Sequence, residues 1–337
     1  MIDTNKVLKY LDRFRDHPPP VNVEVDLSNR CNLGCKFCHF AYTHSKGKHV
    51  KGCKLDPVCG DMMGRKLALK IVQELKEFGV RSVTWAGGGE PTLHPHIIDI
   101  IEATALPQGM YTNGVSMPTT LANVIKRHCT WVYVSLDCIS GKEFATVKRV
   151  KPEIFDWVLD GIERLKAAEG GATIGVGMLV TPDNAHNIQR MYDFVNIEIN
   201  PDYVQFRPAI DAYDNMDWIE TAIDGLLLLE RGETKVFADA RRFAMYLNWD
   251  GHGYINCRWS KAQSVITPNG KVWTCLNRRG FDGDCLGDIN KETFASIWQR
   301  VPMAKVDGRC RVMCRGHIPN KAVENVFSEP EGHEDFI

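Results

Sequence analysis

The sequence lacks long apolar runs and has no excess of charge of either sign. No uninterrupted apolar stretch approaches the roughly 18 residues that a membrane span needs, and the polar start MIDTNK is not followed by the apolar core of a signal peptide. Lys and Arg together number 41 against 42 Asp and Glu, a net charge of -1. We therefore expect a cytoplasmic protein with no membrane partner. A nucleic acid would need a local basic patch, because the whole chain offers no attractive field.

Cysteine is too scarce for a fold held by disulfides. Twelve cysteines in 337 residues fall far below the roughly 8–10% that is typical of disulfide scaffolds, and a reducing compartment keeps thiols free. The apolar share of 44% and the charged share of 25% are ordinary for a globular protein and argue against disorder. The cysteines are therefore expected to be metal ligands or packing residues.

Short apolar runs alternate with amphipathic stretches between residues 21 and 210, a pattern typical of parallel strands joined by crossover helices. Leu67, Ile71, Leu75 and Phe78, for example, share one face of a predicted helix. Six such units predict an α/β fold, a partial (β/α)6 TIM-like barrel with a small Cys-rich C-terminal α+β extension. The expected strands cover residues 21–27, 82–86, 109–112, 131–136, 173–180 and 203–207.

The same pattern divides the chain into five segments. The stretch after the barrel is expected to be helical, because residues 218–229 are apolar and residues 235–247 are amphipathic. The acidic end is expected to fray. The segments are an N-terminal extension (1–20), the core barrel (21–210), a helical linker (211–252), a Cys-rich domain (253–318) and a C-terminal tail (319–337).

Three thiols lie within eight residues, directly after the first expected strand. They are Cys31, Cys35 and Cys38, in a loop where Gly34 lets the chain fold back. Three thiolates can bind three irons of a 4Fe–4S cube and leave the fourth iron open, whereas structural zinc requires four ligands. A zinc knuckle, or a loop of buried cysteines, is the alternative.

A run of glycines ends the second expected strand, in the segment Gly87-Gly88-Gly89-Glu90-Pro91. Backbone groups without side chains, together with the Glu90 carboxylate, suit a positively charged ammonium group. A glycine run alone is more often a turn than a site. The carboxyl ends of parallel strands meet at one rim of a barrel, so this segment and the three cysteines are expected to lie together.

The two motifs together resemble the signature of the radical S-adenosylmethionine (SAM) superfamily, C-x3-C-x-Phe-C and then GGEP. The resemblance implies a 4Fe–4S cluster on the three cysteines, whose open iron chelates the amino and carboxylate groups of SAM. It further implies that Phe37 lies near the adenine and that Gly88, Gly89 and Glu90 bind the methionine amino group. One electron would then cleave SAM into methionine and a 5′-deoxyadenosyl radical, which abstracts hydrogen from an unactivated carbon.

Three further polar residues close apolar strands at the same rim. Asn113 follows the third expected strand, Asp137 follows the fourth, and Arg207 ends the sixth. The family resemblance implies that such residues bind the cofactor, through its ribose and carboxylate. A turn or a helix cap is the alternative for each of them.

A second group of cysteines follows the barrel with a different spacing. Cys257, Gly270 and Cys275 resemble the opening of the SPASM extension and of its shorter "twitch" form, and Cys310 and Cys314 supply two more thiols. The resemblance implies that these four cysteines hold an auxiliary iron–sulfur cluster. We expect one such cluster, because the later cysteine block of the seven-cysteine SPASM pattern is missing.

Alternatives remain for this second group. Zinc in a four-cysteine site is one of them, because spacing does not separate zinc from iron–sulfur. Cys285 is a spare thiol that could replace one of the four. Residues 267–272 are predicted to form a hairpin turn between two strands of this region.

The segment 39–64 is longer than a βα loop needs to be. Its basic residues favour a solvated lid or a clamp for an anionic substrate such as a phosphate or a polynucleotide. Two further cysteines in it could ligate another metal. The basic residues are Lys46, Lys48, His49, Lys51 and Lys54, and the cysteines are Cys53 and Cys59.

Three functions follow from these motifs. The first is oxidation of a small polar or peptide substrate, supported by an auxiliary cluster able to accept the electron of a substrate radical. The second is radical isomerisation of an amino-acid-like adduct on a nucleobase of DNA or RNA, supported by the basic segment alone. Either enzyme needs a one-electron donor such as a flavodoxin or ferredoxin. The third is a non-enzymatic iron–sulfur or zinc module, against which the glycine–glutamate motif argues.

Overall fold

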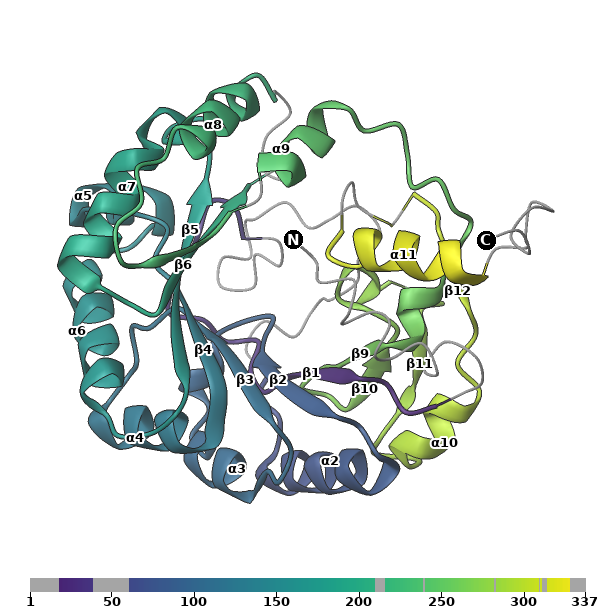
Figure 1. Ribbon diagram of the computed structural model, residues 1–337. Helices are drawn as coiled ribbons and strands as arrows, with labels where there is room; N and C mark the ends of the chain where they lie inside the picture. The colour runs from purple at the N-terminus through teal and green to yellow at the C-terminus, as the bar shows by residue number, and fades with distance from the viewer. Residues whose placement is uncertain are drawn as a thin grey trace.

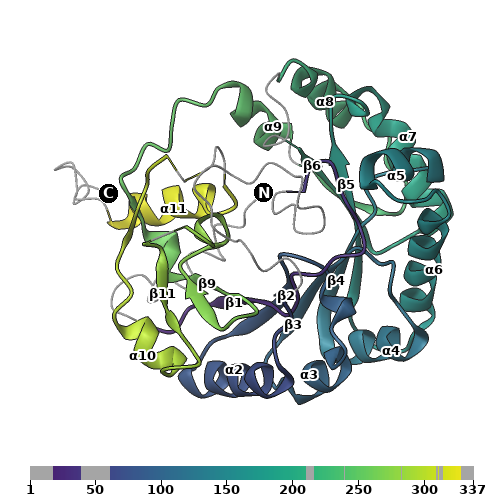
Figure 2. The same cartoon turned by 180° about the vertical axis from the view of Figure 1, so that it is seen from behind.

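The computed structural model describes residues 18–38, 61–209, 216–238, 240–281, 283–308, 310 and 314–327. Strands form a crescent with helices on its outer side, and the C-terminal extension continues one end of this crescent (Figure 1). The view from behind shows the same arrangement, with α10 and α11 on the side of the extension and α4 to α8 on the opposite side (Figure 2). The predicted α/β class with a TIM-like, mostly parallel sheet is confirmed.

The seven strands of the crescent lie side by side in chain order and run parallel. Two of the six predicted strands match in full, and the other four differ by one or two residues at an end. These strands are β1 (Asn22–Asp26), β2 (Ser82–Ala86), β3 (Gln108–Thr112), β4 (Cys129–Ser135), β5 (Thr173–Val180), β6 (Tyr203–Pro208) and β7 (Lys235–Phe237).

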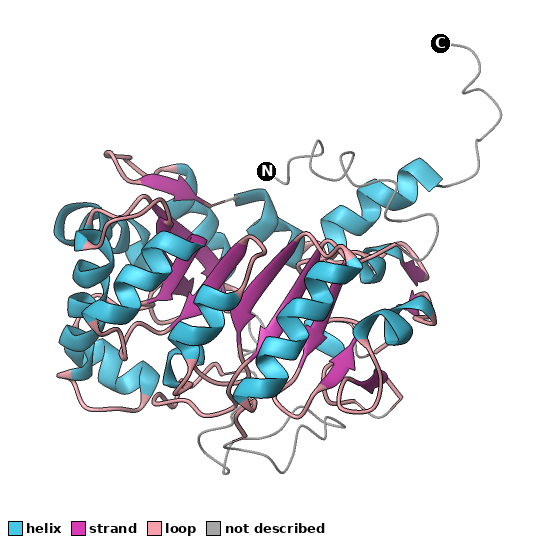
Figure 3. Cartoon of the chain, turned by 90° about the horizontal axis from the view of Figure 1, so that it is seen from below, coloured by secondary structure: helices cyan, strands magenta, loops and turns pink. Residues whose placement is uncertain are grey.

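Crossover helices cover the outer face of the sheet (Figure 3). In α2, Ala68, Ile71 and Leu75 are buried at helical spacing, and Gly79 ends the helix in the left-handed conformation with φ 91°. The helices are α2 (Arg65–Phe78), α3 (Ile97–Ala103), α4 (Thr119–His128), α5 (Gly141–Lys148), α6 (Ile154–Ala167), α7 (Ile188–Phe194), α8 (Trp218–Leu227) and α9 (Ala240–Leu247).

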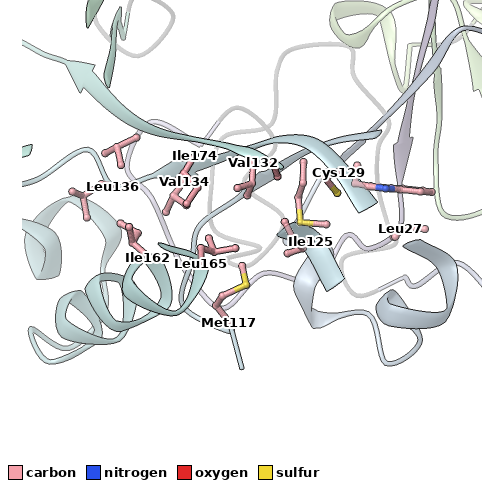
Figure 4. Close-up of a cluster of buried hydrophobic side chains, with 14 of the residues drawn as sticks. Leu27, Met117, Ile125, Cys129, Val132, Val134, Leu136, Ile162, Leu165 and Ile174 are labelled. Carbon is pink, nitrogen blue, oxygen red and sulfur yellow. The ribbon is translucent and has the colours of Figure 1, made fainter. Parts of the chain in front are cut away.

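The hydrophobic core lies between the sheet and these helices. Val132 and Val134 of β4 pack with Ile125 of α4 and with Ile162 and Leu165 of α6 (Figure 4). Since successive side chains of a strand alternate between its two faces, the remaining residues of each strand point to the inside of the crescent. There the strands present polar and aromatic groups, and these groups form the candidate site.

The linker differs from its prediction as an all-helical segment. Residues 218–227 form α8 and residues 240–247 form α9, but Lys235–Phe237 pairs with β6 as a seventh parallel strand. The edge of β6 offers unpaired backbone groups, and the rings of Phe237 and Tyr203 meet edge to face with their centres 4.9 Å apart. Pairing with the edge of β6 therefore makes residues 235–237 a strand, although their surroundings have a helical periodicity.

The Cys-rich extension continues the same sheet. Its strand β9 (Gln263–Ile266) pairs in parallel with β1, and β10 (Lys271–Trp273) and β11 (Cys285–Asp288) follow in antiparallel order. The predicted hairpin turn lies between β9 and β10, with Gly270 at φ 83°. The described sheet is open, with β11 and β7 at its edges.

The remaining elements of the extension dock on the barrel and on one another. Helix α10 (Phe294–Gln299) packs against α2, where the rings of Phe78 and Phe294 lie 5.9 Å apart. Strands β8 (Asn256–Cys257) and β12 (Ala304–Lys305) form a small separate sheet, and α11 (His317–Phe327) follows. Among the described residues, every helix is too short or too polar to span a bilayer.

Candidate functional site

The loop that carries Cys31, Cys35 and Cys38 leaves the carboxyl end of β1 and is fastened to α5. Backbone N–H groups of Gly34 and Lys36 donate to the carbonyls of Lys148 and Val147, at 2.8 and 2.9 Å. The last carbonyls of a helix have no partner within the helix, so the end of α5 offers acceptors for this loop. These hydrogen bonds to a distant part of the chain therefore hold the loop in place.

The chemistry of the three thiols fits a cationic metal cluster. Burial, together with the nearby Glu90, Cys35 and Cys38, raises the pKa of Cys31 to about 12. Burial also raises the pKa of Cys35, which Lys148 opposes. Thiolates are the ligand form of cysteine, and crowded buried thiolates are stable only beside positive charge. An iron cluster supplies that charge.

The glycine run packs directly on the chain that leaves β1. The N–H of Gly89 donates to the carbonyl of Ser28 at 3.0 Å, and the N–H of Glu90 donates to that of Arg30 at 2.7 Å. A Cβ atom on Gly89 would lie 2.1 Å from the Arg30 carbonyl oxygen, so this contact tolerates no side chain. The two motifs form one folded unit.

Glu90 is buried with 2% exposure and accepts hydrogen bonds from the ends of β2 and β3. Its Oε1 accepts from the hydroxyls of Thr92 and Thr112, at 2.8 and 2.6 Å, and its Oε2 accepts from the N–H of Asn113 at 2.7 Å. Burial raises its pKa, and these hydrogen bonds oppose that change. Glu90 thus links the chain segments that follow β2 and β3 by hydrogen bonds. Its expected contact with the methionine amino group of SAM stays a prediction.

Asn113 reaches from the end of β3 to the cysteine loop. Its Nδ2 donates to Asn32 Oδ1 at 2.7 Å and lies 3.7 Å from Cys31 Sγ. A side-chain amide beside a ligand sulfur stabilises negative charge on that sulfur, a known influence on cluster potential. The predicted residue therefore lies in the site, although its role toward the cofactor stays a prediction.

Asp137 forms a buried ion pair with Lys148, a residue that the sequence reasoning missed. Asp137 has φ 64° and accepts from the N–H of Leu179 at 2.9 Å, while the Lys148 ammonium lies 4.9 Å above the Phe37 ring. Burial alone would lower the pKa of Lys148, but Asp137 and Cys35 raise it above its usual value, so the side chain stays charged. In the sequence alone, Lys148 is an ordinary basic residue near a helix end, and no local signal indicates that it forms a buried ion pair.

Arg207 lies on the inner face of β6, beside Leu179 of β5. Its Nη2 donates to the hydroxyl of Tyr133 at 2.7 Å, and its guanidinium carbon lies 4.7 Å from the centre of that ring. The structure thus brings together the cysteine loop, Glu90, Asn113 and Asp137, whereas Arg207 belongs to a neighbouring cluster of tyrosines.

The four predicted auxiliary cysteines converge in the extension. Burial, together with Cys275, Cys314 and Cys310, raises the pKa of Cys257 to about 12, so the four thiols interact electrostatically. Cys285 lies exposed on β11, with its thiol 3.5 Å from the Gly287 carbonyl.

A four-thiol set fits two kinds of metal group. Zinc binds four sulfurs at about 2.3 Å, whereas a 4Fe–4S cube binds one cysteine per iron.

Two ion pairs join the extension to the inner face of β1, and the sequence reasoning missed both. Glu24 pairs with Arg315 at 2.9 Å, and Asp26 pairs with the fully buried Arg279. The two acids are two residues apart, so they share one face of the strand. Strand β1 therefore fixes the auxiliary cysteines relative to the cysteine loop that follows it.

Two family comparisons match this geometry. The sequence model of the Radical SAM superfamily matches residues 25–195, which is half of the chain. The chain belongs to the radical SAM superfamily. The model of the SPASM iron-sulfur cluster-binding domain matches residues 257–322 of this radical SAM enzyme. The expected cofactors are thereby confirmed: a 4Fe–4S cluster with SAM, and auxiliary iron–sulfur.

Two relatives of this radical SAM enzyme carry names that refer to nucleotides. A "Probable GTP 3′,8-cyclase" of Halobacterium salinarum is 26% identical over 260 residues, which cover 74% of this chain and 67% of that protein. An "S-adenosylmethionine-dependent nucleotide dehydratase" of Flammeovirga pacifica is 28% identical over 218 residues, covering 62% and 69%.

A solved structure shares the fold. Streptococcus suis SuiB bound to S-adenosylmethionine superposes with a TM-score of 0.62 at 17% identity, over 89% of this chain and 70% of that one. At this identity the likeness shows the fold alone.

Replacing Cys275 with Ala is expected to lower the iron content of this radical SAM enzyme by about half, because one of two four-iron clusters loses a ligand. Iron analysis after anaerobic reconstitution measures this. The change in the paramagnetic signal of the first cluster on adding SAM should persist, since Cys275 is not in the β1 loop. Cys285→Ser is the matched control and should keep all its iron. Unchanged iron in Cys275→Ala would contradict the auxiliary site.

The basic run of Lys46 to Lys54, and Cys53 and Cys59, lie outside the described residues. Their proposed roles as a lid, an anion clamp or a further metal site stay predictions.

Proposed function

We propose that this radical SAM enzyme abstracts a hydrogen atom from a small polar or peptide substrate on the inner face of the sheet and oxidises it. The observation that carries this is the single folded unit made by the cysteine loop, the Gly87–Pro91 segment and the end of α5. It lies at the carboxyl ends of the strands, where barrels of this kind carry their chemistry.

The residues of this unit have distinct expected roles. Cys31, Cys35 and Cys38 hold the cluster, which when bound supplies the electron that splits SAM into methionine and a 5′-deoxyadenosyl radical. Phe37, Gly88, Gly89, Glu90, Asn113 and Asp137 form the surroundings proposed to bind SAM. Their task is to orient the cofactor and to exclude water and competing hydrogen donors.

Oxidation is favoured by the auxiliary cysteines. A substrate that has lost a hydrogen atom retains an unpaired electron, and an iron–sulfur cluster can accept it. The ion pairs of Glu24 and Asp26 hold the auxiliary region against β1, which also leads into the cysteine loop. Both iron sites therefore flank the same inner face. A one-electron donor such as a flavodoxin or ferredoxin would reduce the first cluster, and the expected location remains the cytoplasm.

A redox-neutral rearrangement of a nucleotide, or of an adduct on a nucleobase, is the second candidate. It is supported by the names of the relatives, a GTP cyclase and a nucleotide dehydratase. The net charge of -1 gives no support to a long nucleic acid as substrate.

Anaerobic incubation with deuterated candidate substrates tests the proposal. Transfer of deuterium into 5′-deoxyadenosine identifies both the substrate and the carbon that loses hydrogen. Oxidation should consume one SAM per product and release electrons to an acceptor, whereas a rearrangement leaves the oxidation state of the substrate unchanged. A reduced enzyme that forms no 5′-deoxyadenosine would contradict both candidates.

A further inference from the structure

Arg207, on the inner face of β6, has no carboxylate partner in the described part of the chain. It contacts Tyr133 through a hydrogen bond to the hydroxyl and a cation–π interaction with the ring. Its Nε is buried, and among the described residues no acceptor reaches it. A buried donor on a charged group is costly when unpaired. The guanidinium therefore needs an acceptor that this part of the chain does not supply.

The neighbouring charges are already neutralised by one another. Burial raises the pKa of Tyr133, which keeps its hydroxyl neutral, so it cannot balance the charge of Arg207. Three buried carboxylates near this inner face hold cationic partners of their own, whereas Glu90 accepts hydrogen bonds from Thr92, Thr112 and Asn113. The pairs are Asp137 with Lys148, Glu24 with Arg315, and Asp26 with Arg279.

Two glycines of β5 make room for the tyrosines that surround Arg207. A Cβ atom on Gly177 of β5 would lie 2.0 Å from the hydroxyl oxygen of Tyr133, and one on Gly175 would lie 2.0 Å from Cζ of Tyr203. The absence of side chains at these two positions lets both tyrosines lie over β5. Tyr133 in turn holds the guanidinium of Arg207 in place.

Tyr111 of β3 extends this cluster of tyrosines. Its ring centre lies 5.3 Å from that of Tyr133, in an edge-to-face arrangement. The cluster holds Tyr133 and, through its hydroxyl, the guanidinium of Arg207.

We propose that Arg207, held in place by Tyr133, binds an anionic group of the substrate, a carboxylate or a phosphate. This inference rests on the proposed function, and it assigns Arg207 to the substrate rather than to SAM. The planar fork of a guanidinium matches two oxygens of such a group. Asp137 interacts electrostatically with Arg207, so a substrate anchored there lies beside the residues expected to surround SAM.

Equilibrium dialysis of the holoenzyme with SAM, using radiolabelled inorganic phosphate and separately acetate, tests the site. Wild type should bind at least one of the two probes, and the preferred probe distinguishes a phosphate from a carboxylate. Arg207→Met should weaken that binding by at least about tenfold, because it removes charge-assisted hydrogen bonds. Arg207→Lys keeps a point charge without the fork and should fall between the two.

Arg65→Met is the matched control, because Arg65 pairs with Asp99 on the outer face and carries the same charge. Its binding should equal that of wild type. Equal binding in Arg207→Met at normal iron content would overturn the site, as would absence of binding in wild type or an equal loss in Arg65→Met. If Arg207→Met does not fold, the binding of the probe by Arg207→Lys decides: weaker binding than wild type supports the site, and equal binding overturns it. Wild type that fails to cleave SAM, but binds phosphate through Arg207, would refute the proposed function and support the site.

Discussion

Cys35→Ala is expected to abolish SAM cleavage. The variant removes one of the three thiolates proposed to hold the cluster, and two ligands leave the cube without the arrangement that keeps one iron open. Cys35 is the central cysteine of a loop that α5 holds through the carbonyls of Lys148 and Val147. The measurement is 5′-deoxyadenosine formed per chain under anaerobic dithionite reduction.

Cys285→Ser is the control for this prediction. Its thiol is exposed on β11, far along the sheet from the β1 loop, so the variant should cleave SAM at the rate of wild type. Full formation of 5′-deoxyadenosine by Cys35→Ala would refute the assignment of the cysteine loop.

Lys148→Met is expected to lower the free energy of unfolding by about 3–5 kcal/mol. It leaves Asp137 as an unpaired buried carboxylate, and removal of one partner of a buried ion pair costs this much. Lys148 is 1% exposed and Asp137 is 7% exposed. The shift of the denaturation midpoint of the anaerobic holoenzyme measures the effect, and weaker retention of the first cluster should accompany it.

Two variants make the test specific. Lys142→Met changes an exposed lysine of the same helix and should alter stability by no more than about 0.5 kcal/mol. Asp137→Asn combined with Lys148→Met removes the buried charge and should recover part of the loss, since Asn also tolerates the left-handed backbone at this position. A Lys148→Met enzyme as stable as Lys142→Met would show that the pair contributes nothing.

The strands of the barrel were predictable because parallel strands buried on one face by helices are nearly continuous apolar runs. Strand β5 shows this, since residues 173–180 were predicted with the ends they have in the structure. Strand β7 was missed because three residues carry no period of their own. Its pairing depends on the free edge of β6, which no local pattern reveals.

The glycine run shows how a motif can be located correctly while its physical reason stays hidden. The sequence indicated a place where backbone groups are exposed to a ligand. The structure adds that Gly89 packs against the carbonyl of Arg30, so that glycine is needed for contact between the two motifs.

The ion pairs of β1 with the extension could not be predicted from the sequence, because each pair joins distant parts of the chain. Glu24 and Arg315 are 291 residues apart, and Asp26 and Arg279 are 253 apart. Each charge in isolation is typical of a solvated surface residue. Only the close approach of β1 and the extension buries the carboxylates and makes their partners necessary.

The sequence by itself determined the order of strands and helices and the two sets of cysteines, because apolar periodicity and ligand spacing are local properties of a chain. Only the tertiary structure decided that Lys148 neutralises Asp137, that β1 joins the two iron sites, and that Arg207 lies among tyrosines without a carboxylate partner in the described part of the chain. The physical reason is that the cost of burying a charge depends on which distant groups surround it, and folding alone brings those groups together.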